Sequence, residues 1–176
     1  PLAILIDLEK RVRSVLTLDE LKFIFVNETH GLIPYRQAIL FESSGRPLTH
    51  SGVAELEHSA PFALWLKKYI SPIVRDVDKA CSITAEDIDP SGLSDWMSWL
   101  PTYGFVQPLA SPTGNSFVKL FLARNEAFSE ADQAMLEVLA GAYGHAWEAL
   151  GGSHKKLTRR RSQKTLKIAF LLIILI

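Results

Sequence analysis

Two strand-like segments separated by a short turn limit most strongly what this chain can fold into. Residues 103–109 (YGFVQPL) and 117–123 (FVKLFLA) are rich in aromatic and aliphatic side chains, a composition that favours strands. Residues 111–115 (SPTGN), which separate them, have the composition of a turn. A connection this short joins antiparallel strands, because parallel strands need a longer crossover. The sequence therefore predicts an antiparallel hairpin here.

A second, shorter hairpin precedes this one. Residues 37–41 (QAILF) read as a strand that turns at Ser43, Ser44 and Gly45 toward a partner near residues 47–49. Apolar residues at helical spacing predict an amphipathic helix over residues 1–16, a helix over 18–30 and a third helix whose apolar positions run from 62 to 74. Residues 81–101 are harder to interpret, and a short helix is expected among their tryptophans.

Capping residues and a proline define the ends of these helices. Thr17 followed by Glu20 is a capping-box pattern for the helix over 18–30, and Gly31 is expected to end it in a left-handed conformation. Ser59 is expected to cap the third helix, in which Pro72 predicts a break or kink at the preceding residue.

A long helix closes the pattern, with Ser129 as its cap and the glycines at 151–152 as its end. The order of elements is thus helices, hairpin, helix, hairpin, helix. Local hairpins without alternating crossover helices predict an α+β fold, in which helices pack on an antiparallel sheet. With 48% apolar residues, the chain has enough material for a sizeable core.

The C-terminal part changes character abruptly. Residues 1–154 hold 12 basic and 19 acidic side chains, whereas the charged side chains that follow are all basic. We expect a basic juxtamembrane linker over residues 153–167, with the membrane-surface side chains Lys155, Lys156, Arg159, Arg160, Arg161, Lys164 and Lys167. Residues 168–176 (IAFLLIILI) are apolar, but in a helix they reach only about 13 Å. A bilayer core is about 30 Å thick, so this segment is expected to be the truncated start of a transmembrane helix.

The linker also predicts a location and a partner. Basic residues that flank a membrane span stay on the cytoplasmic side, which predicts an inner-membrane protein with residues 1–167 in the cytoplasm. The single cysteine, Cys81, agrees with a reducing compartment. Nucleic acid is not the expected partner, because the linker has no interleaved aromatic residues. Anionic lipid suits it better, at about 1 kcal/mol for each basic residue near the surface.

The element order, together with residues 128–132 (FSEAD) at the start of the long helix, resembles the GAF fold over residues 17–152. A narrower resemblance rests on residues 25–29 (FVNET), 32–38 (LIPYRQA), 99–101 (WLP) and 142–146 (AYGHA). These segments are similar to the GAF-like N-terminal region of some hemolysin-D-type membrane-fusion proteins. That resemblance implies a cytosolic domain before one transmembrane helix and a periplasmic adaptor arm of an export pump, and it implies assembly as a homo-oligomer.

Catalysis and metal binding find little support in the residue pattern. The five histidines contain no close pair at a zinc spacing, and Cys81 has no cysteine partner. Nucleophile motifs and glycine-rich phosphate loops are absent from the sequence. Some GAF-fold proteins reduce methionine sulfoxide with several cysteines, which this chain lacks. We therefore expect neither an enzyme nor a metal or other cofactor.

A pocket for a small ligand is the more serious possibility, because GAF-like folds often enclose one between sheet and helices. The candidate residues are Tyr35, Arg36 and Gln37 at a strand entrance, with Trp96 and Trp99 as walls. The alternative is that Arg36 pairs with an acid and the tryptophans fill the core.

Three functional hypotheses remain. The first is a non-enzymatic cytosolic regulatory or interaction domain of a membrane-anchored export adaptor, in contact with export-pump subunits. The second is a small-ligand sensory domain of a membrane-bound signalling protein. The third, an enzyme, would need a catalytic constellation that the sequence does not contain.

Overall fold

A five-stranded antiparallel sheet forms the centre of the molecule. The computed structural model describes residues 2–52, 56–110 and 116–151 of the chain. The strands lie in the order β2-β1-β5-β4-β3, and every neighbouring pair is antiparallel. Their bounds are Gln37–Glu42 (β1), Pro47–His50 (β2), Cys81–Thr84 (β3), Tyr103–Ala110 (β4) and Ser116–Arg124 (β5).

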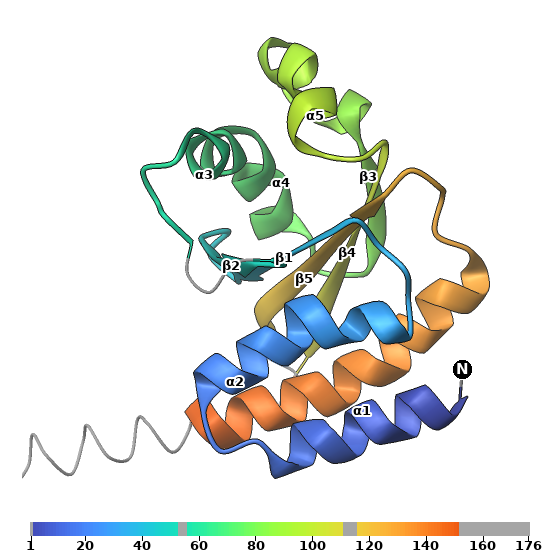
Figure 1. The fold of residues 1–176 in the computed structure, drawn as a ribbon. Helices are drawn as coiled ribbons and strands as arrows, with labels where there is room; N and C mark the ends of the chain where they lie inside the picture. Colours follow the sequence, from blue (N-terminus) through green and yellow to red (C-terminus); the bar gives the residue numbers. More distant parts are fainter. Residues whose placement is uncertain (1, 53–55, 111–115, 152–176) are drawn as a thin grey trace, which may run out of the picture.

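Helices cover both faces of this sheet (Figure 1). On one face lie α1 (Leu2–Ser14), α2 (Leu18–Phe23) and the long helix over residues 130–151, drawn in orange. On the other face lie α3 (Pro61–Trp65), α4 (Ser71–Asp76) and α5 (Leu93–Trp99). Irregular helical turns join or precede these helices. They are the π-helical turns η1 (Ile24–Glu28) and η3 (Leu66–Ile70) and the 3₁₀ turns η2 (Thr29–Gly31), η4 (Ala85–Asp87) and η5 (Pro90–Gly92).

Alternation along the strands separates two hydrophobic cores. In β5, Leu120 and Leu122 belong to the core beneath α1, α2 and the long helix, whereas Phe121 and Ala123 belong to the core beneath α3, α4 and α5. Successive side chains of a strand point to opposite faces, so the sheet is a wall between the two cores. Trp96 is fully buried in the second core. Much of the space between the sheet and α3–α5 is therefore filled by the chain itself.

Both predicted hairpins are present. β1 pairs with β2 and β4 pairs with β5, and the turn residues 111–115 lie outside the described residues. Two predicted caps are also confirmed. Thr17 Oγ1 accepts a hydrogen bond from the backbone N–H of Glu20 (3.2 Å), and Ser129 Oγ accepts one from that of Asp132 (3.2 Å).

Two local predictions were wrong, and one strand was missed. Gly31 is not left-handed, because the chain continues in right-handed helical geometry through Leu32. The third helix begins after Ala60 rather than Ser59, because Pro61 occupies its first turn, where a missing N–H costs nothing. The strand β3 was not recognised, since its four residues alternate too briefly to give a pattern.

A buried hydroxyl pair fixes the long helix against η2. Thr29 Oγ1 and the Tyr143 hydroxyl lie 2.6 Å apart, and both side chains are almost wholly buried. Burial raises the pKa of Tyr143, so the phenol stays neutral at physiological pH. The Tyr143 ring also stacks on Phe25, with centroids 4.1 Å apart.

Replacing Thr29 with valine should therefore cost the chain about 1–2 kcal/mol of unfolding free energy, since a buried hydroxyl loses its partner. Urea denaturation of Thr29→Val, Tyr143→Phe and the double variant measures the coupling between the two groups. Losses that simply add would show that the hydroxyls do not stabilise one another.

Candidate ligand pocket

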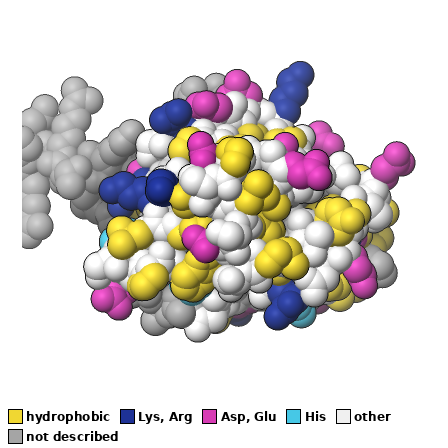
Figure 2. All heavy atoms as spheres, turned by 90° about the horizontal axis from the view of Figure 1, so that it is seen from above, with side chains coloured by type: hydrophobic (Ala, Val, Ile, Leu, Met, Phe, Trp, Pro, Cys, Tyr) yellow, Lys and Arg dark blue, Asp and Glu magenta, His cyan; other side chains and the backbone are white. Residues whose placement is uncertain are grey.

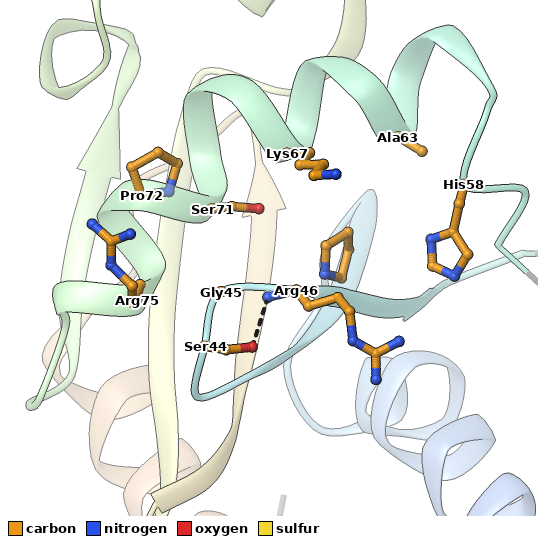
Figure 3. A pocket seen from close by; sticks show the side chains of 10 residues that line it. Ser44, Gly45, Arg46, His58, Ala63, Lys67, Ser71, Pro72 and Arg75 are labelled. Atoms are coloured by element: carbon orange, nitrogen blue, oxygen red, sulfur yellow. Dashed lines mark hydrogen bonds between the residues drawn. The ribbon is translucent and has the colours of Figure 1, made fainter.

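A pocket of about 460 Å³ lies where the β1–β2 turn meets the helical segment that runs from α3 through η3 to α4 (Figure 3). Sites for small ligands commonly measure roughly 300–1,000 Å³. Its described lining residues are Ser44, Gly45, Arg46, Pro47, His58, Ala63, Lys67, Ser71, Pro72 and Arg75. The pocket therefore lies toward the β2 edge of the sheet rather than inside the second core.

Gly45 brings the turn and the helix together. Its φ of +86° is left-handed, and its N–H donates a 2.9 Å hydrogen bond to the Glu42 carbonyl. A Cβ atom at this position would collide with the backbone carbonyl oxygen of Ser71 and lie 3.2 Å from Arg75 Cβ. Gly45 is thus required for two reasons, the left-handed backbone conformation and the close approach of the turn to the helix.

The helical wall of the pocket is built around a π-helical turn. Ala63, Lys67, Ser71 and Arg75 recur at every fourth position, which places them on one side of the helix. The break or kink expected before Pro72 is not a break, because α4 follows the π-helical turn directly at Ser71. Instead, the backbone N–H of Ser71 bonds to the Leu66 carbonyl, five residues back, and α4 continues through the proline. π-helical turns of this kind are often found at functional sites.

Two polar groups of the helix lie between it and the turn. Figure 3 shows Lys67 and Ser71 there, while the guanidinium groups of Arg46 and Arg75 extend toward opposite sides of the pocket. Ser71 Oγ is buried and has no hydrogen-bond partner among the described residues. A buried hydroxyl without a partner is costly, so a group that satisfies it would bind there favourably.

The two arginines of the rim are already paired in part. Arg46 Nε donates to Glu42 Oε2 at 3.0 Å, and a second nitrogen of the same guanidinium bonds to Oε1. These hydrogen bonds hold the pKa of Glu42 below its ordinary value and raise the pKa of Arg46. Arg75 Nε donates to Asp76 Oδ1 at 3.0 Å, which likewise lowers the pKa of Asp76. Both carboxylates therefore stay ionised and leave several arginine N–H groups available.

Lys119, on strand β5, holds the end of α4 against the sheet. It lies on β5 with only 3% of its surface exposed, and its Nζ donates to the carbonyls of Val74 and Arg75, at 2.7 Å each. These carbonyls belong to the last turn of the helix, where intrahelical partners run out, and the Val74 carbonyl also accepts a 3.3 Å hydrogen bond from the backbone N–H of Val77. Burial lowers the pKa of Lys119. The sheet thereby holds the helix end that carries Arg75 in place.

Tyr35 and Trp96, which the sequence predicted as pocket residues, are core residues of opposite faces. Tyr35 belongs to the first core, and its hydroxyl donates a 2.8 Å hydrogen bond to the Val26 carbonyl. Trp96 belongs to the second core, and its indole N–H donates a 2.9 Å hydrogen bond to the Pro101 carbonyl. The sheet separates the two side chains, so they do not line one pocket.

Arg36, Gln37 and Trp99 do not complete such a pocket either. Arg36 is exposed, and Gln37 is the half-buried first residue of β1. Trp99 is 37% exposed and leans on Phe62, with ring centroids 5.6 Å apart. The structure thus brings together none of the five predicted residues at the pocket. Of the residues that line the pocket, Lys67, Ser71 and Arg75 share one feature visible in the sequence, which is their four-residue spacing.

Metal-binding clusters and membrane-spanning helices are absent from the described ranges. No group of three or more His, Cys, Asp or Glu side chains gathers there in a way that would hold a metal ion. Among residues 2–52, 56–110 and 116–151, no helix has the length and apolar character to span a membrane. The predicted linker (153–167) and transmembrane start (168–176) lie outside the described residues.

A second hollow and scattered apolar side chains lie on the surface of the described residues. A hollow of about 450 Å³ lies between α1 and the long helix and is lined mainly by small and aliphatic residues, with Arg13 and His145. Figure 2 looks onto the upper side of the molecule in Figure 1, where apolar side chains lie among charges of both signs. Exposed residues of α3 and α5 include Leu64, Leu93 and Met97.

Comparisons with known proteins identify the fold. No family model and no curated protein sequence matches the chain. Among solved structures, the GAF domain assigned to a sensor histidine kinase of Pseudomonas syringae pv. tomato is similar, with a TM-score of 0.60 at 16% identity over 90% of this chain and 92% of that one. The GAF domain/HD domain protein of Geobacter sulfurreducens gives a TM-score of 0.53 at 15% identity, over 78% of this chain and 97% of that one.

A third similar structure is the phycoerythrobilin-bound GAF domain of a cyanobacterial phytochrome, with a TM-score of 0.57 at 13% identity, over 86% of this chain and 96% of that one. At these identities the likeness concerns the fold and not the ligand. It confirms the α+β, GAF-like fold expected from the sequence, and it does not extend to an export adaptor. The described part of this chain therefore has the fold of a GAF domain.

Proposed function

We propose that this domain is a non-enzymatic sensory or regulatory module that binds a small molecule in the pocket between the β1–β2 turn and α4. The observation that carries the proposal is the pocket itself, with the buried hydroxyl of Ser71 unpartnered beside Lys67. GAF-fold domains are commonly regulatory, and a phytochrome GAF domain of the same fold holds a bilin. Fold alone does not fix function, so the argument rests on the site.

The elements around the pocket offer a route by which binding could alter the rest of the domain. Lys119 joins the end of α4 to β5. At the end of β5, Arg124 bonds to Asp132 Oδ2 at 2.5 Å, in the first turn of the long helix. A ligand that shifts α4 would thus act on a strand that is tied to the long helix at its other end.

A thermal-unfolding screen of the full chain tests this function. Small molecules of neutral, anionic and cationic classes are added in turn, and a ligand at 100 times its Kd stabilises the folded state by about 2.7 kcal/mol. For a chain of this size, such stabilisation raises Tm by roughly 5–10 °C. We expect at least one class to do so.

Two tryptophan variants locate the binding. Ser44→Trp places a bulky ring at the exposed pocket mouth and should abolish the Tm rise. Ser94→Trp, at an exposed serine of α5 outside the pocket lining, should leave the Tm rise unchanged. The proposal fails if no class raises Tm, or if both variants respond like the parent chain.

The membrane-anchored contexts are a separate proposal, carried by the basic run before the apolar residues 168–176. In one context, the domain belongs to an export adaptor and lies on the cytoplasmic side of the inner membrane. There it contacts anionic lipid and pump subunits, and it assembles as a homo-oligomer. In the other, it belongs to a membrane-bound signalling protein. The test fuses one reporter after residue 151 and a second beyond the completed span of the full-length protein. Either membrane-anchored context places the two reporters on opposite sides of the membrane. A tail that does not span the membrane would leave both reporters in the cytosol.

A further inference from the structure

We infer that the ligand of this pocket carries an oxyanion group, phosphate or carboxylate, and that Lys67 is its main charged contact. This inference rests on the proposed function, because it assigns a chemical class to the ligand of the same pocket. It is carried by the charges of the lining, the buried hydroxyl and the lack of acidic side chains among the described residues of the lining.

The charge of Lys67 is the least compensated of the pocket. Within the described ranges, no carboxylate forms an ion pair with it, whereas Arg46 and Arg75 are bound to Glu42 and Asp76. Figure 3 shows the Lys67 side chain directed along the space between helix and turn. An ammonium group in this position is a ready donor for an incoming anion.

Ser71 supplies a second donor at the same place. Its Oγ lies buried one helical turn after Lys67 and lacks any hydrogen-bond partner within the described ranges. An oxyanion has several lone pairs and would accept from this hydroxyl and from the ammonium together once the Ser71 side chain turns into the pocket, because its Oγ has almost no exposed surface as it stands. A cationic ligand would satisfy the hydroxyl but would be repelled by Lys67.

The arginines favour the same ligand class. After pairing with Glu42, the Arg46 guanidinium still has N–H groups free, and Arg75 uses only its Nε on Asp76. Guanidinium groups match the planar oxygens of carboxylates and the tetrahedral oxygens of phosphates. Among the described residues that line the pocket, none is acidic. The lining is thus one-sided in charge, which concentrates anions from solution.

The test uses inorganic pyrophosphate as the probe on the full chain at constant ionic strength. Its binding is followed by the backbone amide resonances of residues 44–46 and 71–75 in nitrogen-15-labelled protein. We expect a saturable shift with a Kd in the millimolar range or below. Citrate, titrated in the same way, shows whether carboxylates bind more tightly or more weakly than phosphates.

A matched pair of lysine variants assigns the contact. Lys67→Met should weaken pyrophosphate binding by about tenfold or more, the usual effect of losing a charge-assisted hydrogen bond. Lys68→Met removes the same charge one residue further on, from a lysine outside the pocket lining that lies over the Tyr69 ring, 4.7 Å from its centroid. Its Kd should stay within about twofold of the parent, because exposed charges at a distance are screened.

Three outcomes would overturn the inference. The first is no saturable shift with either anion, and the second is equal weakening by both lysine variants. The third is pyrophosphate binding that Ser44→Trp leaves intact, which would place the anion elsewhere on the surface. A neutral compound that raises Tm in a manner sensitive to Ser44→Trp, while neither anion binds, would overturn the anion assignment alone and leave the sensory function standing.

Discussion

Gly45→Ala should destabilise the domain by on the order of 3 kcal/mol and separate the β1–β2 turn from α4. Its left-handed φ of +86° alone costs a residue with a Cβ about 1–2 kcal/mol. The new Cβ would also collide with the Ser71 carbonyl, a backbone atom that cannot rotate away. Forcing extra volume into a packed contact typically adds about 1–3 kcal/mol. Urea denaturation with tryptophan fluorescence measures the loss.

Gly52 provides the matched control for this variant. Its φ of +83° is nearly the same, but a Cβ there would meet no atom within 4 Å. Gly52→Ala should therefore lose only the conformational part, about 1–2 kcal/mol. The difference between the two variants isolates the contact of turn and helix. Equal losses would show that the turn tolerates a side chain and that the pocket is less tightly built than the structure indicates.

Lys119→Met should also lower the unfolding free energy by about 3 kcal/mol. The methionine fills a similar volume, but the carbonyls of Val74 and Arg75 each lose a 2.7 Å hydrogen bond from a charged donor. Hydrogen bonds to charged groups contribute about 1.5–3 kcal/mol, and the Val74 carbonyl keeps only its 3.3 Å hydrogen bond from the Val77 N–H. The measurement is again urea denaturation, with the amide resonances of α4 as a local reporter.

Lys67→Met is the control, because it makes the same lysine-to-methionine substitution at an exposed position. Lys67 is exposed on the helix surface, so its replacement should change stability by no more than about 0.5 kcal/mol. The two lysine-to-methionine variants should thus separate a stabilising role at position 119 from a binding role at position 67. A fully stable Lys119→Met chain would mean that apolar packing replaces the buried ammonium without loss, as is known for some buried charges.

Much of the fold was predictable because its signals are local. The hairpins follow from runs of strand-forming apolar residues on either side of turn sequences, and the helix starts at Thr17 and Ser129 follow from side-chain caps that the structure confirms. Each of these features depends on residues within a few positions of one another. The cap predicted at Ser59 was wrong, because Pro61 fixes the helix start after Ala60 without any side-chain hydrogen bond.

The candidate site was much less predictable. Its walls come from residues 44–47 and 58–75, and nothing in either segment indicates that they touch. The aromatic residues drew attention instead, yet Tyr35 and Trp96 satisfy their polar atoms with backbone carbonyls inside two different cores. A buried lysine in a strand, such as Lys119, likewise has a partner that only the tertiary structure reveals.

The π-helical turn at Leu66–Ile70 has a consequence for the phase of the helical wall. A π-helical turn contains one residue more than the α-helical turn it replaces, and each residue of an α-helix turns the chain by about 100°. The turn takes up this extra residue locally, so deletion of a single residue within it would restore a regular ladder and leave Ala63 and Arg75 on the side that they now share. The two ends of the pocket wall are therefore insensitive to a one-residue change of length in this segment, and chains one residue shorter here would still present both ends of the wall to the turn.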